Sequence, residues 1–145
     1  MQYNANQDIR TVRRYFVGGT ALRNGQILCY QENASETNED PKLRLGHAVE
    51  AINSDNLKFL AGVVSASDAG KVGPCFVELI QPQSADVVDA ETDGTVAIVV
   101  GDLLELDDTL GALVNGAPAF GQVAFLALEA NAVAAAKTAI RVQKV

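Results

Sequence analysis

The sequence predicts a mainly β protein, a small β-barrel or sandwich with at most one short helix. Short runs in which apolar and polar residues alternate recur along the chain at intervals of roughly 8–15 residues. Asn, Asp and Gly residues that favour turns separate these runs. Together they predict about eight or nine short strands, a pattern typical of all-β barrels and sandwiches. The length of 145 residues fits one domain, which we place at residues 18–145 after an extended arm at residues 1–17.

The amino-terminal part contains the arm, the first strand and a long loop. Residues 1–17 show no convincing hydrophobic period, which indicates an extended arm that gains order from a neighbour. Asn24 and Gly25 supply the positive φ of a tight turn before a strand at residues 26–30. Residues 31–42 contain four acids, a proline and no aliphatic side chain larger than alanine, so we expect an exposed loop.

Five further strands are expected in the middle of the chain. Alternation predicts a strand with a glycine bulge at residues 43–52 and another strand at residues 58–66. Apolar runs predict strands at residues 74–80 and 95–100, with a short edge strand at residues 85–88 between them.

The segment after residue 100 is expected to turn at once into a short strand. In residues 101–106, Leu104 and Leu106 fall on one face of that strand. Residues 110–116 fit either a helical turn or a hairpin closed at Asn115 and Gly116. We favour the hairpin.

The last quarter predicts a strand, a small-residue turn and a closing strand. Branched and aromatic residues alternate with polar ones in residues 121–131 and 138–145. The alanine tract between them, residues 132–137, is too short to stand as a helix unless something packs on it. The chain is therefore expected to end inside its own sheet.

The charge pattern indicates an acidic body with a basic amino-terminal segment. The net charge of −7 argues against a nucleic-acid or anionic-membrane binder, because phosphate contacts need a cationic face. The chain has neither an apolar run long enough to span a membrane nor an amino-terminal signal peptide, so we expect synthesis in a cytoplasm.

The amino-terminal segment also carries the residue types that are enriched at protein interfaces. Aromatic anchors and guanidinium groups stand together there, in a segment without a core period. The interface candidates are Tyr3, Arg10, Arg13, Arg14, Tyr15 and Phe16. The alternative is that Tyr15, Phe16 and Val17 begin the first strand, and both readings can hold.

Two acidic clusters imitate functional sites. Residues 89–94 match the first half of a calcium loop, but position twelve is Val100, where a glutamate is needed, so we interpret them as an acidic turn. A second cluster is interpreted as a solvated acidic rim, because a strand sends its members to different faces. That cluster consists of Asp102, Glu105, Asp107 and Asp108.

Motifs of catalysis and cofactor binding are missing from the sequence. His47 is the only histidine, and neither a nucleophile elbow nor a phosphate-binding glycine loop is present. We interpret Cys29 and Cys75 as buried free thiols, since a metal site needs more ligands. We therefore expect a protein that is not an enzyme and that uses no cofactor and no metal. An enzyme would need the carboxylates of residues 102–108 to converge with His47 in a cleft.

Three segments resemble the small head-decoration, or capsid cement, proteins of tailed bacteriophages. The resemblance is carried by Gly101-Asp-Leu-Leu, by residues 120–130, which run Phe-Gly-Gln-Val-Ala-Phe-Leu-Ala-Leu-Glu-Ala, and by Thr138-Ala-Ile-Arg-Val. It extends more loosely from Gly18 onward. The acidic loop at residues 31–42 and the arginine-bearing arm depart from the family pattern.

The resemblance implies a β-tulip-like barrel that binds the outside of an expanded icosahedral head as a homotrimer. Its partners would be the major capsid protein and itself, and its location the outer surface of the virion. The main alternative is a β-barrel module that binds a small ligand or a carbohydrate. Such a module needs exposed aromatic residues around a pocket, yet this chain has no Trp.

Overall fold

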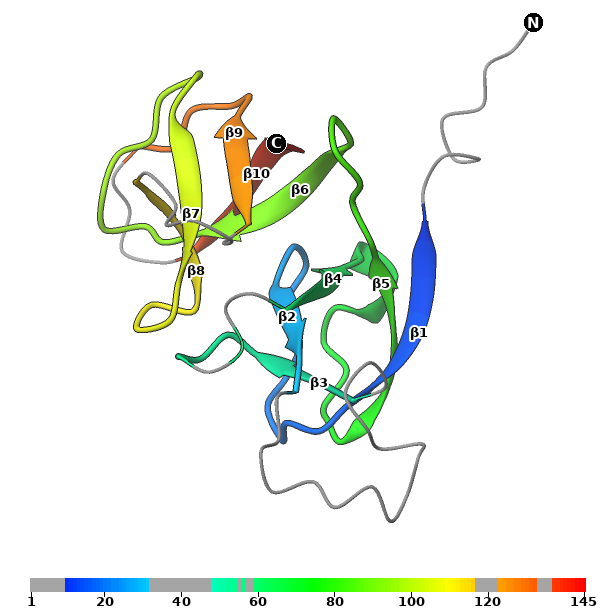
Figure 1. Cartoon of the computed structure of the whole chain (residues 1–145). Coiled ribbons are helices and arrows are strands. Elements are labelled where there is room, and N and C mark those ends of the chain that lie inside the picture. The colour runs from blue at the N-terminus through cyan, green and yellow to red at the C-terminus, as the bar shows by residue number, and fades with distance from the viewer. Residues whose placement is uncertain (1–9, 32–47, 55, 57–58, 117–122, 133–136) are drawn as a thin grey trace, which may run out of the picture.

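The computed structural model describes residues 10–31, 48–54, 56, 59–116, 123–132 and 137–145 (Figure 1). Within these residues, ten strands and one short 3-10 helix, Ala66–Asp68, make up the regular structure. The strands are β1 (Thr11–Phe16), β2 (Ile27–Tyr30), β3 (Ala48–Ala51), β4 (Leu60–Val64), β5 (Cys75–Ile80), β6 (Val87–Thr92), β7 (Leu103–Asp107), β8 (Ala112–Asn115), β9 (Ala124–Ala127) and β10 (Thr138–Lys144). The predicted mainly β fold is confirmed.

The strands form two closed five-stranded sheets, one from each half of the chain. The first barrel has the order β1-β3-β2-β4-β5, and the second has the order β10-β6-β8-β7-β9. Closure removes the free edges along which sheets aggregate. Figure 1 shows the first barrel around β1 and β5 and the second around β7 and β9.

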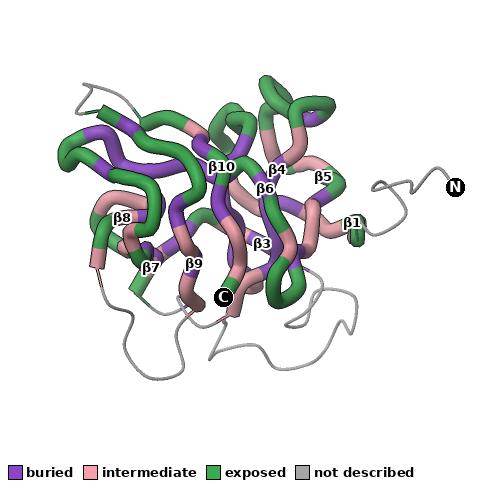
Figure 2. The backbone as a smooth tube through the Cα atoms, turned by 90° about the horizontal axis from the view of Figure 1, so that it is seen from above, coloured by how far each residue is buried: buried purple, intermediate pink, exposed green. Residues whose placement is uncertain are grey.

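The two barrels share a hydrophobic core. Ile27, Cys29 and Val63 of the first barrel belong to the same buried cluster as Phe125 and Ile140 of the second. A separate cluster fills the first barrel and includes Phe16, Leu28 and Leu79. Figure 2 shows buried segments running through both barrels. The shared cluster couples the packing of one barrel to that of the other.

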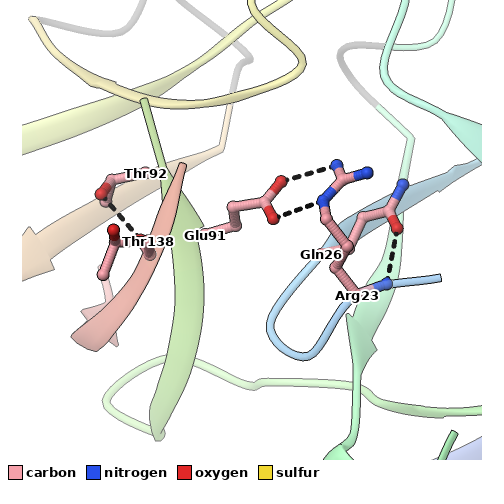
Figure 3. A network of polar contacts seen from close by, with 5 residues as sticks. All are labelled: Arg23, Gln26, Glu91, Thr92 and Thr138. Atoms are coloured by element: carbon pink, nitrogen blue, oxygen red, sulfur yellow. Dashed lines mark hydrogen bonds and ion pairs between the residues drawn. The ribbon is translucent and has the colours of Figure 1, made fainter. Parts of the chain in front are cut away.

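A tight turn of the first barrel docks on β6 of the second. Gly25, at φ +80°, accepts a hydrogen bond from the Glu91 N–H at 2.8 Å. Beside it, Arg23 donates two hydrogen bonds to the Glu91 carboxylate, from Nε at 2.7 Å and from Nη2 at 2.8 Å (Figure 3). The Arg23 N–H is itself held by the Gln26 side chain at 3.1 Å. A bidentate pair of this kind fixes both distance and orientation between the elements.

Several expected elements are confirmed. The turn at Gly25, the strands at 26–30, 58–66 and 74–80, and the closing strand all appear within a few residues of their expected places. In β7, Leu104 and Leu106 are both buried on the same face, as expected. The expected loop at 31–42 lies almost wholly outside the described residues.

The expected arm is wrong for residues 11–16. They form β1, which pairs along its whole length with β5 and also contacts β3. The pattern of β1 looks irregular because Arg14 stands on the inner face beside Val12 and Phe16, which hides the period of two. Residues 1–9 lie outside the described residues.

Two expectations in the second half are corrected. Residues 95–100 do not form a strand, since only Ile98 makes a bridge, to Asn131, while Val96, Val99 and Val100 are exposed. The strand lies earlier, as β6, over the expected edge strand and part of the expected acidic turn. The hairpin of β7 and β8 closes at residues 108–111 instead of at 115–116.

Candidate interaction surface

The predicted interface residues lie in different environments in the structure. Tyr3 lies outside the described residues. Phe16 is 1% exposed in the core of the first barrel, so its prediction as an interface residue is wrong. Arg10 forms a hydrogen-bonded ion pair with Asp86 at 3.3 Å, which ties the start of β1 to the segment between the barrels.

The pleat of β1 separates Arg14 from Arg13 and Tyr15. Arg14 points to the inner face, where its guanidinium carbon lies 5.7 Å from the centre of the Tyr30 ring. Its Nη1 donates to the Arg13 carbonyl at 2.9 Å, whereas its Nε is buried without a hydrogen-bond partner among the described residues. Arg13 and Tyr15 point to the outer face. Arg14 is therefore a barrel residue, and the other two are surface residues.

Arg13 and Tyr15 meet Phe76 of β5 on this outer face. Tyr15 stands directly opposite Phe76 in the antiparallel register, and their ring centres lie 5.2 Å apart in an edge-to-face arrangement. The Arg13 guanidinium carbon lies 4.9 Å from the centre of the Phe76 ring. Phe76 nonetheless remains 53% exposed. We call Arg13, Tyr15, Lys71 and Phe76 the Phe76 surface.

A shallow hollow of about 200 Å³ lies beside Phe76. Residues of β1, of β5 and of the loop between β4 and β5 line it. Its lining includes Arg13, Lys71 and Phe76, together with Asp68 and Glu78. Asp68 is buried, and its carboxylate accepts hydrogen bonds from Lys71 Nζ at 2.8 Å and from the Glu78 N–H at 2.7 Å. The charges that face solvent are therefore Arg13, Lys71 and Glu78.

These contacts shift the pKa values of the Asp68 and Lys71 pair. Burial by itself would raise the pKa of Asp68, but the hydrogen bonds from Lys71 and from the Glu78 N–H outweigh it and lower that pKa. The hydrogen bond to Asp68 raises the pKa of Lys71, against the opposing effects of desolvation and of nearby Arg13. Both groups stay charged at neutral pH, so Lys71 is held in place as a cation at the rim.

An exposed aromatic ring with a guanidinium over its face is suited to protein contact. Aromatic and arginine side chains supply much of the energy at interfaces. Aromatic rings bury a large area at a small cost in side-chain entropy, and guanidinium groups stack on them. The ring is fixed by Tyr15 and the guanidinium stacks on it, so the surface needs little rearrangement to bind. β1 and β5, which carry this surface, pair within a closed sheet, and closure keeps the surface rigid.

Sequence reasoning missed Phe76. It lies in an apolar run that is typical of a buried strand, in which Val77 and Leu79 are indeed buried. Strict alternation in the run Cys75–Ile80 places Phe76 and Glu78 on one face, and Glu78 is the signal that this face is the outer one.

The acidic clusters hold the backbone instead of forming a reactive site. Asp102 accepts hydrogen bonds from the Val99 N–H and from Asn115, and Asp107 accepts one from the Leu110 N–H. In residues 89–94, which were interpreted as an acidic turn, Glu91 accepts hydrogen bonds from Arg23 and Asp93 accepts one from the Thr95 N–H. Within the described part of the chain, no group of three or more His, Cys, Asp or Glu residues is arranged to hold a metal ion. His47 lies outside the described residues.

The two cysteines occupy different environments. Cys29 is fully buried in the shared core, where burial and the nearby Glu50 carboxylate raise the pKa of its thiol to about 12. Cys75 is only half-buried, which corrects the expectation that both thiols are buried. Both are free.

Comparisons with protein-family models and with curated proteins find no match for this chain. Among the described residues, no helix is long and apolar enough to cross a membrane.

Proposed function

We propose that this chain is a capsid decoration, or cement, protein of a tailed bacteriophage. In this proposal it binds the outside of the expanded icosahedral head as a homotrimer, contacts the major capsid protein and stabilises the shell. It acts without chemistry of its own and is made in the host cytoplasm before it joins the virion.

The observation that carries the proposal is the arrangement of the segments that resemble this family. They are separate in the sequence, at residues 101–104, 120–130 and 138–142. In the fold they include parts of β7, β9 and β10, and β9 pairs with β7 on one side and β10 on the other. A resemblance spread over three segments thus falls on one continuous piece of sheet. This supports a shared fold element more strongly than three unrelated matches do.

The physical properties of the chain fit a cement protein. Both sheets are closed, so that many copies can be crowded on a shell without pairing through free strand edges. The Phe76 surface offers a rigid contact that needs no ligand. Weak contacts of this kind become effective when many copies act on one shell.

Binding to heads tests the proposal. Purified protein is sedimented with expanded capsids that lack it, and the bound amount is measured against the major capsid protein. We expect saturable binding that approaches one copy per capsid subunit, and much weaker binding to unexpanded capsids. A chain that stays in the supernatant with expanded capsids would contradict the proposal and favour a ligand-binding barrel.

A deletion then tests the amino-terminal arm. Residues 11–16 form a strand of the first barrel, so only residues 2–9 can be removed without breaking the sheet. If this segment latches a neighbour or the shell, the shortened chain keeps its fold and loses affinity for expanded capsids. Unchanged affinity would remove the arm from the proposal.

A further inference from the structure

The outer face of the second barrel carries an apolar surface that the fold itself does not use. Leu103 of β7 stands opposite Leu126 of β9, and continuing this register places Gly101 opposite Leu128. The three leucines therefore lie side by side on the outer face, and Leu103 and Leu128 are exposed. Gly101 adds no side chain over Leu128.

A tight turn extends this surface with two valines. Val99 and Val100 are 58% and 63% exposed and directly precede Gly101, whose φ is +96°. The turn is closed by the Asp102 N–H, which donates to the Val99 carbonyl at 3.1 Å. The Asp102 carboxylate in turn accepts the Val99 N–H at 2.9 Å and Asn115 Nδ2 at 2.7 Å. Surface turns usually carry polar residues, so a fixed turn with two exposed valines indicates a contact.

We call Val99, Val100, Leu103, Leu126 and Leu128 the leucine face. Its surroundings are acidic, because half-buried Glu105 follows Leu103 on the same face of β7 and exposed Glu129 follows Leu128. Continuing the register of β9 with β10 places Arg141 opposite Leu128, where it forms an ion pair with Asp89 at 3.7 Å. The leucine face is therefore apolar with an acidic rim.

The Phe76 surface has the complementary character. It presents an exposed aromatic ring and the exposed cations Arg13 and Lys71. The carboxylate of Asp68, which holds Lys71 at 2.8 Å, lies buried beneath the rim, and Glu78 stands opposite Arg13. Pairing the leucine face with a copy of itself would bring the carboxylates of two acidic rims together. Pairing the leucine face with the Phe76 surface brings opposite charges together around an apolar centre.

The two surfaces belong to opposite ends of the molecule. Both views place β5, which carries Phe76, and its neighbour β1 at one end of the molecule and β7 at the other (Figures 1 and 2). One copy therefore cannot close the contact on itself, and two copies that meet through it leave one surface of each kind free. Such a heterologous contact repeats from copy to copy and closes into a ring when the rotation allows.

We propose that copies of this chain associate head to tail, with the leucine face of one copy packed on the Phe76 surface of the next. The inference rests on the proposed function only for the number of copies, three, and the contact itself follows from the two surfaces. It places Phe76 against Val99, Val100 and the leucines of the neighbour, with Arg13 and Lys71 facing the acidic rim.

Sedimentation velocity of the free protein tests this contact without any capsid. We expect the wild-type chain to assemble. F76E and V100E should each weaken assembly by at least about tenfold. Each variant places a carboxylate in the apolar centre of the contact, close to the acidic rim of the leucine face. R13E serves as a second variant of the Phe76 surface. S84E, which adds the same charge at an exposed turn between the barrels, is the matched control and keeps wild-type assembly. Circular dichroism confirms that all variants are folded.

A mixture of F76E and V100E tests the head-to-tail order. Each variant keeps one intact surface, so the mixture forms a one-to-one complex although neither variant associates alone. A wild-type chain that stays monomeric, a folded F76E or V100E that assembles normally, or a mixture without a complex would each overturn the inference. These results concern the contact between copies, and the co-sedimentation experiment with the wild-type chain measures capsid binding separately.

Discussion

Cys29 reports directly on the packing between the two barrels. Its thiol lies in the shared core, and burial followed by the Glu50 charge raises its pKa to about 12. Only the thiolate reacts with alkylating reagents, so a buried and protonated thiol is inert. Half-buried Cys75 has access to solvent by comparison.

Alkylation is therefore expected to distinguish the two cysteines. With iodoacetamide at about pH 8, below the ordinary thiol pKa, Cys75 is modified in the native protein and Cys29 only after unfolding. Peptide mass spectrometry gives the two rates, and C75A supplies the control in which native protein is not labelled at all. Rapid labelling of Cys29 in folded protein would contradict its place in the core.

Asp68 makes stability depend on pH at the acid end. Its pKa is lowered in the folded state, so its stabilising contribution is complete above the ordinary aspartate value and is lost as the pH falls through the lower value. We expect the free energy of unfolding of the wild type to fall more steeply below about pH 4 than that of D68N, which cannot titrate at this position.

Denaturant unfolding at a series of acid pH values measures this difference. D89N is the matched control, because Asp89 is an exposed aspartate whose nearest cation lies at the longer distance of 3.7 Å. If the free energy of unfolding falls equally steeply with pH for the wild type and D68N, the Lys71 contact does not hold in solution.

At the scale of elements, the turn at Gly25 determines how the first barrel meets the second. A side chain at this position has two costs, since the φ of +80° disfavours L-residues and a Cβ atom would lie 2.7 Å from that of Ala139. We expect G25A to lower the free energy of unfolding by about 2–4 kcal/mol. Chemical denaturation measures the loss.

Gly70 provides the control for this substitution. It has a similar φ of +90°, but no atom lies near the position of its missing Cβ. G70A therefore has only the conformational cost and is expected to destabilise by about 1–2 kcal/mol. If both variants lose the same stability, the turn at Gly25 does not pack against β10.

Strands with regular alternation were predictable from sequence, whereas those with long-range polar partners were not. The closing strand Thr138–Lys144 and the buried pair Leu104 and Leu106 followed from alternation alone. β6 was obscured because Asp89 and Glu91 make it look like an acidic turn. The charge of Glu91, whose side chain is only 4% exposed, is matched by Arg23, 68 residues earlier, which no local pattern reveals.

Residues 95–100 were expected to form a strand because of their valines, but they do not. β-branched residues favour strands in general, but that preference depends on a neighbour against which they pack. Here Asp102 closes a turn around Val99 and Val100, and the segment contributes a single bridge to the sheet. The residue types at Arg13 and Tyr15 already indicate an interface, but their contact with Phe76 depends on the register of β1 with β5, which the sequence does not reveal.

At the scale of the whole molecule, the shared core joins two closed barrels that present different surfaces to their surroundings. The first barrel carries the Phe76 surface, and the second carries the leucine face at the opposite end. Because the core cluster includes residues of both barrels, the two surfaces keep a fixed relation to one another. A rigid unit with two complementary ends is suited to link neighbours on a shell.

As a decoration protein, the chain would stabilise expanded phage heads. The most direct test of this stabilisation is the temperature at which DNA-filled heads lacking the protein rupture, measured by release of DNA to an intercalating dye, before and after saturation with purified chain. We expect a higher rupture temperature with the bound protein, and a smaller increase with F76E at equal occupancy. Heads that are fully occupied yet rupture at the same temperature as bare heads would contradict the proposal.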